Sequence, residues 1–216
     1  MPAAIGLMAK APRPGLAKTR LIPALGAEGA AALARAFIAD SAALARTAGV
    51  EVVLLATPAE AMAELASLAG LAALAQRGGD LGARMDSAFA DLFVRGFAPV
   101  LLIGSDSPAL PPAHLGAALG LAAAHPEAVV LGPAEDGGYW CVGLSRPVAG
   151  LFEAIAWGTG SVLAETEARA ARLGVAVRHA PAWHDVDLPA DLARLRDDLS
   201  RNPAAAPFTR RLLALS

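Results

Sequence analysis

The sequence has little cysteine and little surplus charge of either sign. Its single cysteine, Cys141, excludes an intramolecular disulfide and a cysteine-rich zinc site. Because Cys141 lies in an apolar segment, we expect a small buried side chain there rather than a nucleophile. The formal net charge is −2 and no long basic block occurs. Binding along nucleic acid is therefore not expected, although a local basic pocket for phosphates remains open.

Long apolar runs are also scarce. Only about seven apolar residues precede Lys10, which is short for a signal peptide and far too short to span a bilayer. No other stretch reaches about 18 apolar residues without a charge or a proline. These absences predict a soluble, cytoplasmic protein that does not bind membranes.

Three common active-site signatures are missing. The P-loop pattern GxxxxGK[ST] is absent, which disfavours P-loop hydrolysis of a nucleotide. The pattern GxSxG is absent, so the sequence gives no sign of a serine hydrolase. No GxGxxG follows the first predicted strand, and a nicotinamide cofactor is therefore not expected.

The pattern that is present is an alternation of short apolar runs with helical stretches. Hydrophobic residues make up 56% of the 216 residues and charged residues 18%, which excludes a disordered chain. The alternation predicts an α/β fold with a mostly parallel sheet covered on both faces. Strands are predicted at 3–9, 51–57, 71–76, 99–104, 128–131, 139–144 and 175–179, and helices at 28–48, 58–68, 81–94, 111–124, 161–173 and 189–199. We expect one nucleotide-binding domain over residues 1–200 and a C-terminal tail, a loop and a short helix, over 201–216.

Polar segments follow three of the predicted strands. KAPRPG follows the first strand, SDSP follows PVLLIG, and EDGG follows AVVLGP. In open α/β sheets, ligands bind beyond the carboxyl ends of the strands. We therefore expect the three segments to converge on one crevice.

The first polar segment, residues 10–21, is basic. It carries Lys10, Arg13, Lys18 and Arg20 and contains no acidic residue. Such cations, with backbone donors, are what a diphosphate or triphosphate needs. A solvated basic loop is the alternative, and the position at a strand end favours phosphate binding.

Two acidic segments are candidates for a metal site. Asp106 follows a buried strand, where a carboxylate can hold Mg²⁺, although a helix N-cap is an equal alternative. Asp185 and Asp187 alternate, so an extended segment would point both to one side. Asp187 is also a natural cap for the helix predicted at 189–199. His184 is expected to be structural, because Mg²⁺ seldom takes imidazole.

Two glycine-rich loops complete the candidates. In QRGGDLGARM the free N–H groups of the following helix, and Arg84, could contact a base or a phosphate. In GPAEDGGYW, paired glycines allow close approach to a ligand, with Glu135 and Asp136 beside them. An ordinary glycine turn is an alternative for the first loop, and a hairpin turn is the better local interpretation of the second.

Taken together, these segments resemble the GT-A-type nucleotide-diphospho-sugar transferase superfamily. Within it they resemble the branch similar to 2-phospho-L-lactate guanylyltransferase, the rSAM/selenodomain-associated transferase family. The resemblance runs from about residue 4 to about residue 195 and is carried jointly by KTRL at 18–21, GSDSPALP, GPAEDGGYW and DVDLPADL. Two features depart from the superfamily: KAPRPGLAKTRL replaces the loop GGxGxRM, and the motif DxD appears only as SDS.

The resemblance implies a Rossmann-like GT-A fold and a role for each segment. Asp106 and Asp187 would hold Mg²⁺ or Mn²⁺ and, with Lys18, form the catalytic set. The remaining assignments are Lys10, Arg13, Lys18 and Arg20 for the nucleotide phosphates, Gly79, Leu81 and Gly82 for the base, and Asp136, Gly137 and Gly138 for the acceptor.

The function expected is nucleotidyl transfer with Mg²⁺, from a nucleoside triphosphate to a small phosphorylated or carboxylate acceptor. Glycosyl transfer from a nucleotide-sugar is one alternative, and a nucleotide-binding module without turnover is another. The sequence leaves the base, the acceptor and the oligomeric state open, a homodimer included.

Overall fold

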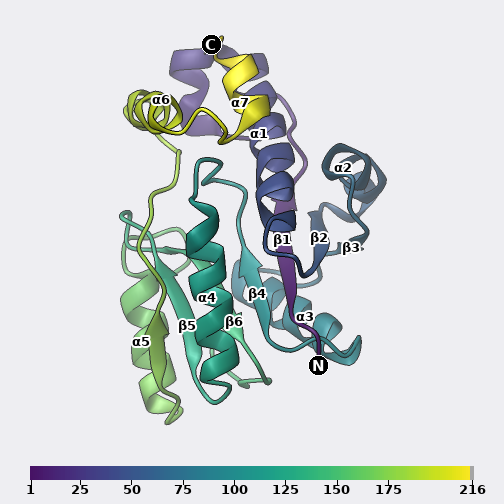
Figure 1. The fold of residues 1–216 in the computed structure, drawn as a ribbon, viewed down its shortest axis with the longest axis vertical. Helices are drawn as coiled ribbons and strands as arrows, with labels where there is room; N and C mark the ends of the chain where they lie inside the picture. Colours follow the sequence, from purple (N-terminus) through teal and green to yellow (C-terminus); the bar gives the residue numbers. More distant parts are fainter. Residues whose placement is uncertain (215–216) are drawn as a thin grey trace.

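The centre of the molecule is a mixed β-sheet with helices on both faces. The computed structural model describes residues 1–214, and over them a seven-stranded sheet has the order β3-β2-β1-β4-β6-β5-β7 (Figure 1). Its strands are β1 (Ala4–Lys10), β2 (Glu51–Thr57), β3 (Ala73–Ala75), β4 (Val100–Ile103), β5 (Val129–Pro133), β6 (Tyr139–Leu144) and β7 (Val177–His179). The predicted α/β class is confirmed.

Most neighbouring strands run parallel, and β6 is the exception. β1 pairs in parallel with β2 and β4, β2 with β3, and β5 with β7, whereas β6 runs antiparallel to both β4 and β5. The central strands are continuous apolar runs because helices cover both of their faces. On β1, a Cβ at Gly6 would lie 2.5 Å from Leu102 Cδ2, so only glycine lets the two strands pack this closely.

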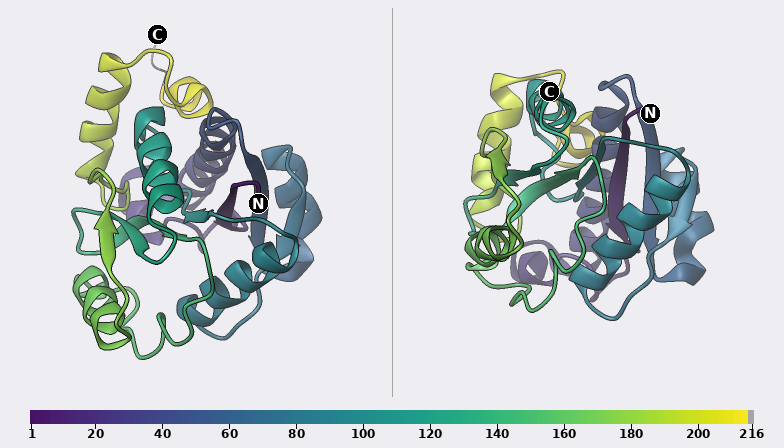
Figure 2. Two further views of the ribbon diagram at one scale, coloured as in Figure 1. Left: turned by 60° about the horizontal axis from the view of Figure 1, so that its bottom comes forward. Right: turned by 90° about the horizontal axis from the view of Figure 1, so that it is seen from below.

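The helices divide between the two faces of the sheet (Figure 2). One face packs against α1 (Ile22–Arg46), α2 (Met62–Ala69) and α4 (Pro112–Ala124). The other packs against α3 (Leu81–Val94) and α5 (Val162–Arg172). Short 3₁₀ turns at Thr19–Leu21 and Ala59–Ala61 lead into α1 and α2.

Helix α1 begins earlier than predicted. It starts at Ile22 rather than at residue 28, with Pro23 in its first turn and a break at Gly26, whose φ is 70°. Proline suits the first turn of a helix, since its missing N–H would have no partner there. Because Gly26 interrupts the helical spacing of apolar residues, the sequence pattern does not indicate this first turn.

Within residues 1–214, one helical stretch, Thr19–Arg46, is apolar and long enough to cross a membrane by length and composition alone. It contains Pro23 and charged residues such as Glu28 and Arg35, so it is not the uncharged, proline-free run whose absence the sequence predicts. It lies near the N-terminus, and 44% of its most apolar window is buried. Phe37 and Ile38 are fully enclosed in the core, as expected of a core helix in a globular domain.

The C-terminal part packs on α1. Helix α6 (Asp191–Arg201) and helix α7 (Pro207–Leu212) enclose a third apolar cluster with the first half of α1 (Figure 1). The Asp40 carboxylate of α1 accepts hydrogen bonds from the backbone N–H groups of Phe208 (3.0 Å) and Thr209 (2.8 Å). The predicted short helix is present, and α1 supplies the acceptor for its free amino-terminal N–H groups.

Candidate functional site

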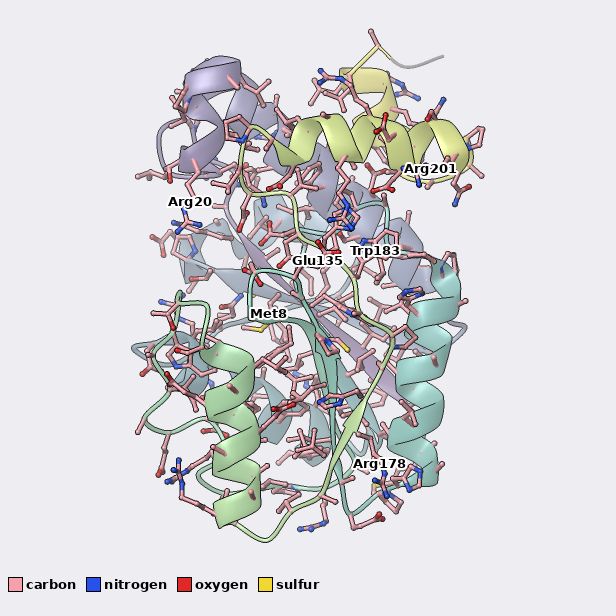
Figure 3. All side chains as sticks on the ribbon, turned by 90° about the vertical axis from the view of Figure 1, so that its left-hand side faces the viewer. Met8, Arg20, Glu135, Arg178, Trp183 and Arg201 are labelled. Carbon is pink, nitrogen blue, oxygen red and sulfur yellow. The ribbon has the colours of Figure 1, made fainter. Side chains whose placement is uncertain are left out.

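A cleft of about 540 Å³ opens at the carboxyl ends of the parallel strands. Its polar lining includes Lys10, Lys18, Arg20, Asp106, Asp185 and Asp187. Figure 3 labels Met8, which lines the cleft from β1, and Arg20, an exposed residue that also lines it. KAPRPG and SDSP therefore meet at one cleft, as predicted, and the segment with Asp185 and Asp187 joins them. EDGG, the third segment expected there, lies outside the lining.

The Lys18 ammonium lies between the two predicted metal ligands. Its Nζ is 2.5 Å from Asp106 Oδ1 and 2.7 Å from Asp187 Oδ1, and it donates to the Val186 carbonyl at 2.8 Å. An ammonium has three donors, and these three oxygens use all of them. The Lys18 side chain is 7% exposed. Asp106 and Asp187 thus converge on one cation, and that cation is a lysine of the chain.

Local backbone structure places this lysine. Lys18 has φ 47° and ψ 45°, the left-handed conformation, immediately before the 3₁₀ turn. For a residue with a Cβ, that conformation costs roughly 1–2 kcal/mol. The Asp106 carbonyl accepts from the Val186 N–H at 2.9 Å, which joins the two acidic segments. The ammonium also lies 5.4 Å from the centre of the Phe37 ring.

Burial and charge shift the pKa of two groups in the cleft. Burial alone would lower the pKa of Lys18, but the Asp106 and Asp187 carboxylates raise it above its ordinary value, so the lysine stays protonated. Burial raises the pKa of Asp185 to about 6, although the Ser107 hydroxyl donates to its Oδ1 at 2.5 Å.

The structure corrects both capping alternatives. Helix α4 begins at Pro112, so Asp106 does not cap it. Helix α6 begins at Asp191, whose own Oδ2 accepts from the N–H groups of Asp187 (2.9 Å) and Leu188 (2.7 Å). The capping position before this helix is Ala190, which has no side-chain acceptor, and the Asp187 carboxylate bonds to Lys18 instead.

His184 lies outside the cleft lining. It is buried, and its Nε2 is 2.9 Å from Asp198 Oδ2 on α6. The flanking residues Asp185 and Asp187 both line the cleft, which is the alternation expected of an extended segment. The structural role expected for His184 agrees with this placement.

The four cations of the basic segment do not all reach the cleft. Lys10 lines it while its Nζ donates to the Leu16 carbonyl at 3.1 Å, and Arg20 lines it with an exposed side chain. Arg13 lies outside the lining and is ion-paired with Glu64 of α2 at 2.5 Å. Arg13 was assigned to the nucleotide phosphates, but its guanidinium is paired with a carboxylate from a distant helix, which the spacing of the basic segment could not indicate.

Among the residues assigned to the base, the structure brings one to the cleft. Leu81 lines it, as does Arg84 one turn later. Gly79 and Gly82 lie outside the lining, and a Cβ at Gly82 would lie 2.5 Å from the Phe152 carbonyl. The Asp80 side chain caps α3 by accepting from the Ala83 N–H at 2.8 Å.

The acceptor assignments form the turn of the β5–β6 hairpin, which was the alternative expected locally. Asp136 Oδ1 accepts from the Gly138 N–H at 2.9 Å. A Cβ at Gly137 would lie 2.0 Å from the Gly160 carbonyl. All three residues lie outside the cleft lining, whereas the next two, Tyr139 and Trp140, belong to it.

Sequence reasoning missed Gln76, which lines the cleft at the end of β3. Its Nε2 donates to the Leu55 carbonyl at 2.6 Å and to the Ala9 carbonyl at 3.5 Å. With both amide hydrogens held by the backbone, the side-chain oxygen is left as an acceptor. The signal available was its position, since Gln76 is the last residue of a predicted strand and so lies at its carboxyl end.

The residues present fit a divalent cation. Among residues 1–214, no group of three or more His, Cys, Asp and Glu side chains is arranged to hold a metal. Mg²⁺ is commonly held by one or two carboxylates together with substrate phosphates rather than by a cage of protein ligands. The oxygens of Asp106 and Asp187, both bonded to one cation position, suit that mode.

Comparison with known proteins identifies the family. Residues 38–159 match the family model DUF2064, described as an uncharacterized protein conserved in bacteria. The chain belongs to this family. It is 33% identical over 182 residues to phosphoenolpyruvate guanylyltransferase of Rubrobacter xylanophilus, covering 83% of this chain and 87% of that protein.

Solved structures agree with the family. A protein assigned as a nucleotide-diphospho-sugar transferase of Desulfovibrio desulfuricans G20 has a TM-score of 0.89 at 30% identity, covering 98% of this chain and 94% of its own. Rv0371c of Mycobacterium tuberculosis H37Rv, solved with manganese, has a TM-score of 0.53 at 22% identity, with coverage of 89% and 97%. At 22% identity, the likeness to Rv0371c is evidence of a shared fold only. The predicted resemblance to a GT-A-type guanylyltransferase branch is confirmed.

Proposed function

We propose that this protein is a divalent-metal-dependent nucleotidyltransferase. It transfers a nucleoside monophosphate from a nucleoside triphosphate to the phosphate or carboxylate of a small acid. The observation that carries the proposal is the meeting of Asp106, Asp187 and Lys18 in a cleft also lined by Lys10 and Arg20. Opposite charges arranged in this way suit a triphosphate, which needs cations for its oxygens and carboxylates for its metal.

The chemistry needs no protein nucleophile. An oxygen of the acceptor attacks the α-phosphorus, the bond to the β-phosphate oxygen breaks, and pyrophosphate leaves. A divalent cation held by Asp106 and Asp187 would neutralise charge that develops on the phosphates. Lys10 and Arg20 hold the departing pyrophosphate, and fixed cations of this kind lower the barrier without reorganising.

Guanosine triphosphate and phosphoenolpyruvate are the substrates to test first. The Rubrobacter xylanophilus relative is named for guanylyl transfer to phosphoenolpyruvate. In this chain the free Gln76 oxygen would accept from an N–H group of the base, a donor that guanine offers at N1 and at its 2-amino group. We further propose a cytoplasmic location, where nucleoside triphosphates are available.

Glycosyl transfer from a nucleotide-sugar is the second candidate. It is favoured by the Desulfovibrio desulfuricans structure, which is 30% identical and assigned as a nucleotide-diphospho-sugar transferase. The same carboxylates and cations would hold the diphosphate of such a donor. The two reactions differ in their product, because glycosyl transfer releases a nucleoside diphosphate and nucleotidyl transfer releases pyrophosphate.

The test is an assay of product release. The purified protein is incubated with Mg²⁺, each of the four common nucleoside triphosphates, and a panel of small acids that includes phosphoenolpyruvate. Pyrophosphate release that depends on the acid, with a new phosphoanhydride in the ³¹P spectrum, supports the proposal. Release of a nucleoside diphosphate from nucleotide-sugars in its place supports the second candidate. If the protein binds nucleotide but releases neither product, it is a nucleotide-binding module without turnover.

The substitution Asp106→Ala checks the metal assignment. Removing one charge-stabilising group at a transferring phosphoryl centre lowers kcat by about 100-fold or more. Asp197→Ala is the matched control, because Asp197 is exposed on α6 and outside the cleft. Circular dichroism establishes that both variants are folded. Full turnover in Asp106→Ala would remove Asp106 from the proposed site.

A further inference from the structure

The Lys18 ammonium occupies the place where a divalent cation is expected. Its Nζ lies 2.5 Å from Asp106 Oδ1 and 2.7 Å from Asp187 Oδ1, the two carboxylates assigned to the metal. An ion that drew on the same oxygens would have to share them with this ammonium or replace it. The lysine therefore already uses the oxygens assigned to the metal.

Three observations show that the ammonium is held there firmly. Its hydrogen bonds are complete, since the Val186 carbonyl takes the third donor at 2.8 Å. Its side chain is 7% exposed, whereas the two aspartates are 48% and 41% exposed. The backbone of Lys18 adopts the left-handed conformation, which is unfavourable for lysine and which the surrounding structure must maintain.

The net charge of Lys18 and its two aspartates indicates when Lys18 would leave them. Two carboxylates and one ammonium carry −2 + 1 = −1. Adding a free divalent ion beside a retained ammonium gives +1, with two cations sharing the same partly buried oxygens. A triphosphate arriving with its metal brings negative oxygens of its own, and these can accept the hydrogen bonds that Lys18 gives up.

We propose that Lys18 is a built-in competitor of the divalent cation, released from Asp106 and Asp187 only when nucleotide phosphates replace them as acceptors. The ligand of this site is then the metal–nucleotide complex rather than free metal followed by nucleotide. The inference rests on the proposed function for the identity of the ligand. It goes beyond that function in predicting that free metal binds weakly and that metal and nucleotide bind cooperatively.

Binding of Mn²⁺ without turnover tests the inference. Mn²⁺ affinity is measured by the electron paramagnetic resonance signal of the free ion, first with protein alone. It is then measured with the α,β-methylene analogue of guanosine triphosphate, using water-proton relaxation to distinguish Mn²⁺ on the protein from Mn²⁺ on free analogue. The proteins are wild type, Lys18→Met, and Lys10→Met as a matched control that removes a cleft lysine whose Nζ donates to the Leu16 carbonyl.

Two results are expected, one for Mn²⁺ alone and one for the increase in Mn²⁺ affinity that the analogue produces. Lys18→Met binds Mn²⁺ alone more tightly than wild type, by about 5- to 150-fold, the usual range of coupling between two ligands. The analogue then raises Mn²⁺ affinity less in Lys18→Met than in wild type. Lys10→Met leaves the affinity for Mn²⁺ alone unchanged. Adding Asp187→Asn to Lys18→Met abolishes the gain, which places the ion at this carboxylate.

Unchanged or weaker binding of Mn²⁺ alone by Lys18→Met would overturn the inference. So would a wild-type protein whose Mn²⁺ affinity is the same with and without the analogue. If Lys18→Met does not fold, Lys18→Gln replaces it, and the wild-type comparison decides the matter without any variant. Failure of the proposed reaction would show as absent pyrophosphate release with this competition intact, so the two failures are distinguishable.

Discussion

The contact between Asp40 and helix α7 gives a prediction that is independent of function. Asp40 is 2% exposed and accepts from the N–H groups of Phe208 and Thr209, and Thr209 is itself fully buried. Replacing Asp40 by alanine removes both acceptors and leaves these N–H groups without a partner inside the protein. Asp40→Asn retains one oxygen and tests how much of the effect depends on charge.

The size of the effect follows from these two bonds. A hydrogen bond to a charged group contributes about 1.5–3 kcal/mol, and loss of a helix cap costs about 0.5–2 kcal/mol. Since α7 can separate from α1 and recover solvent for its N–H groups, we expect about 2–4 kcal/mol for Asp40→Ala, below the sum of the bonds. For a chain of this length, that is a fall in Tm of about 4–16 °C. Asp40→Asn is expected to cost about half as much.

The assay is thermal and urea unfolding followed by circular dichroism, repeated over pH. Burial raises the pKa of Asp40 above its ordinary value, more than its hydrogen bonds lower it. The folded protein therefore holds this proton more tightly than the unfolded chain. The stability from this effect is fully present below the unfolded pKa and is lost as pH rises through the folded pKa. We expect the stability difference between wild type and Asp40→Asn to narrow as pH rises above the ordinary pKa of an aspartate, about 3.9.

The reasoning would be refuted if Asp40→Ala unfolded within about 0.5 kcal/mol of wild type, the usual range for an exposed substitution. Asp197→Ala, an exposed aspartate on α6, supplies that range as a control. If the difference in unfolding free energy between wild type and Asp40→Asn widened as pH rose, the pKa of Asp40 could not be raised in the folded protein.

Two further predictions concern the centre of the sheet and the hairpin. Gly137→Ala should destabilise the fold by about 1–3 kcal/mol in thermal unfolding, since φ is 87° and the new Cβ would meet the Gly160 carbonyl at 2.0 Å. Its control is Gly116→Ala on the exposed side of α4, where a new Cβ would have no atom of residues 1–214 within 4 Å apart from its chain neighbours and the backbone of its own helix. Cys141 should resist iodoacetamide at pH 8 in the native protein and react fully in denaturant, because the residue is 1% exposed and burial raises the pKa of its thiol; rapid native labelling would contradict this.

Much of the fold could be predicted because its elements carry local signals. The strand at 51–57 and the helix at 81–94 have the predicted bounds, as both are set by apolar periodicity and by residues that end an element. The first turn of α1 was missed because Gly26 interrupts its spacing. The start of α6 was misplaced because Asp187 suits a cap, whereas in the folded chain its carboxylate bonds to Lys18 and Ala190 takes the capping position.

The sequence predicted where the residues of the candidate site gather better than it predicted which side chains contact one another. The carboxyl ends of the strands indicated where Lys10, Lys18 and Asp106 would gather, and the cleft brings them together. Spacing could not predict that Lys18 pairs with the aspartates, or that Arg13 pairs with Glu64, because each pair joins distant segments. Gln76 was missed because a lone glutamine has no motif, and its function depends on which carbonyls hold its amide.

The reversed direction of β6 has a consequence for how such a cleft can change over evolutionary time. Because β6 enters the sheet from the same edge at which β1 and β4 leave it, its first residues, Tyr139 and Trp140, line the cleft and the hairpin turn leads directly into them. Insertions or deletions in that turn would move Tyr139 and Trp140 while Asp106 and Lys10, which follow or end separate strands, keep their places. Relatives with different acceptors are therefore expected to differ most in the length of this turn.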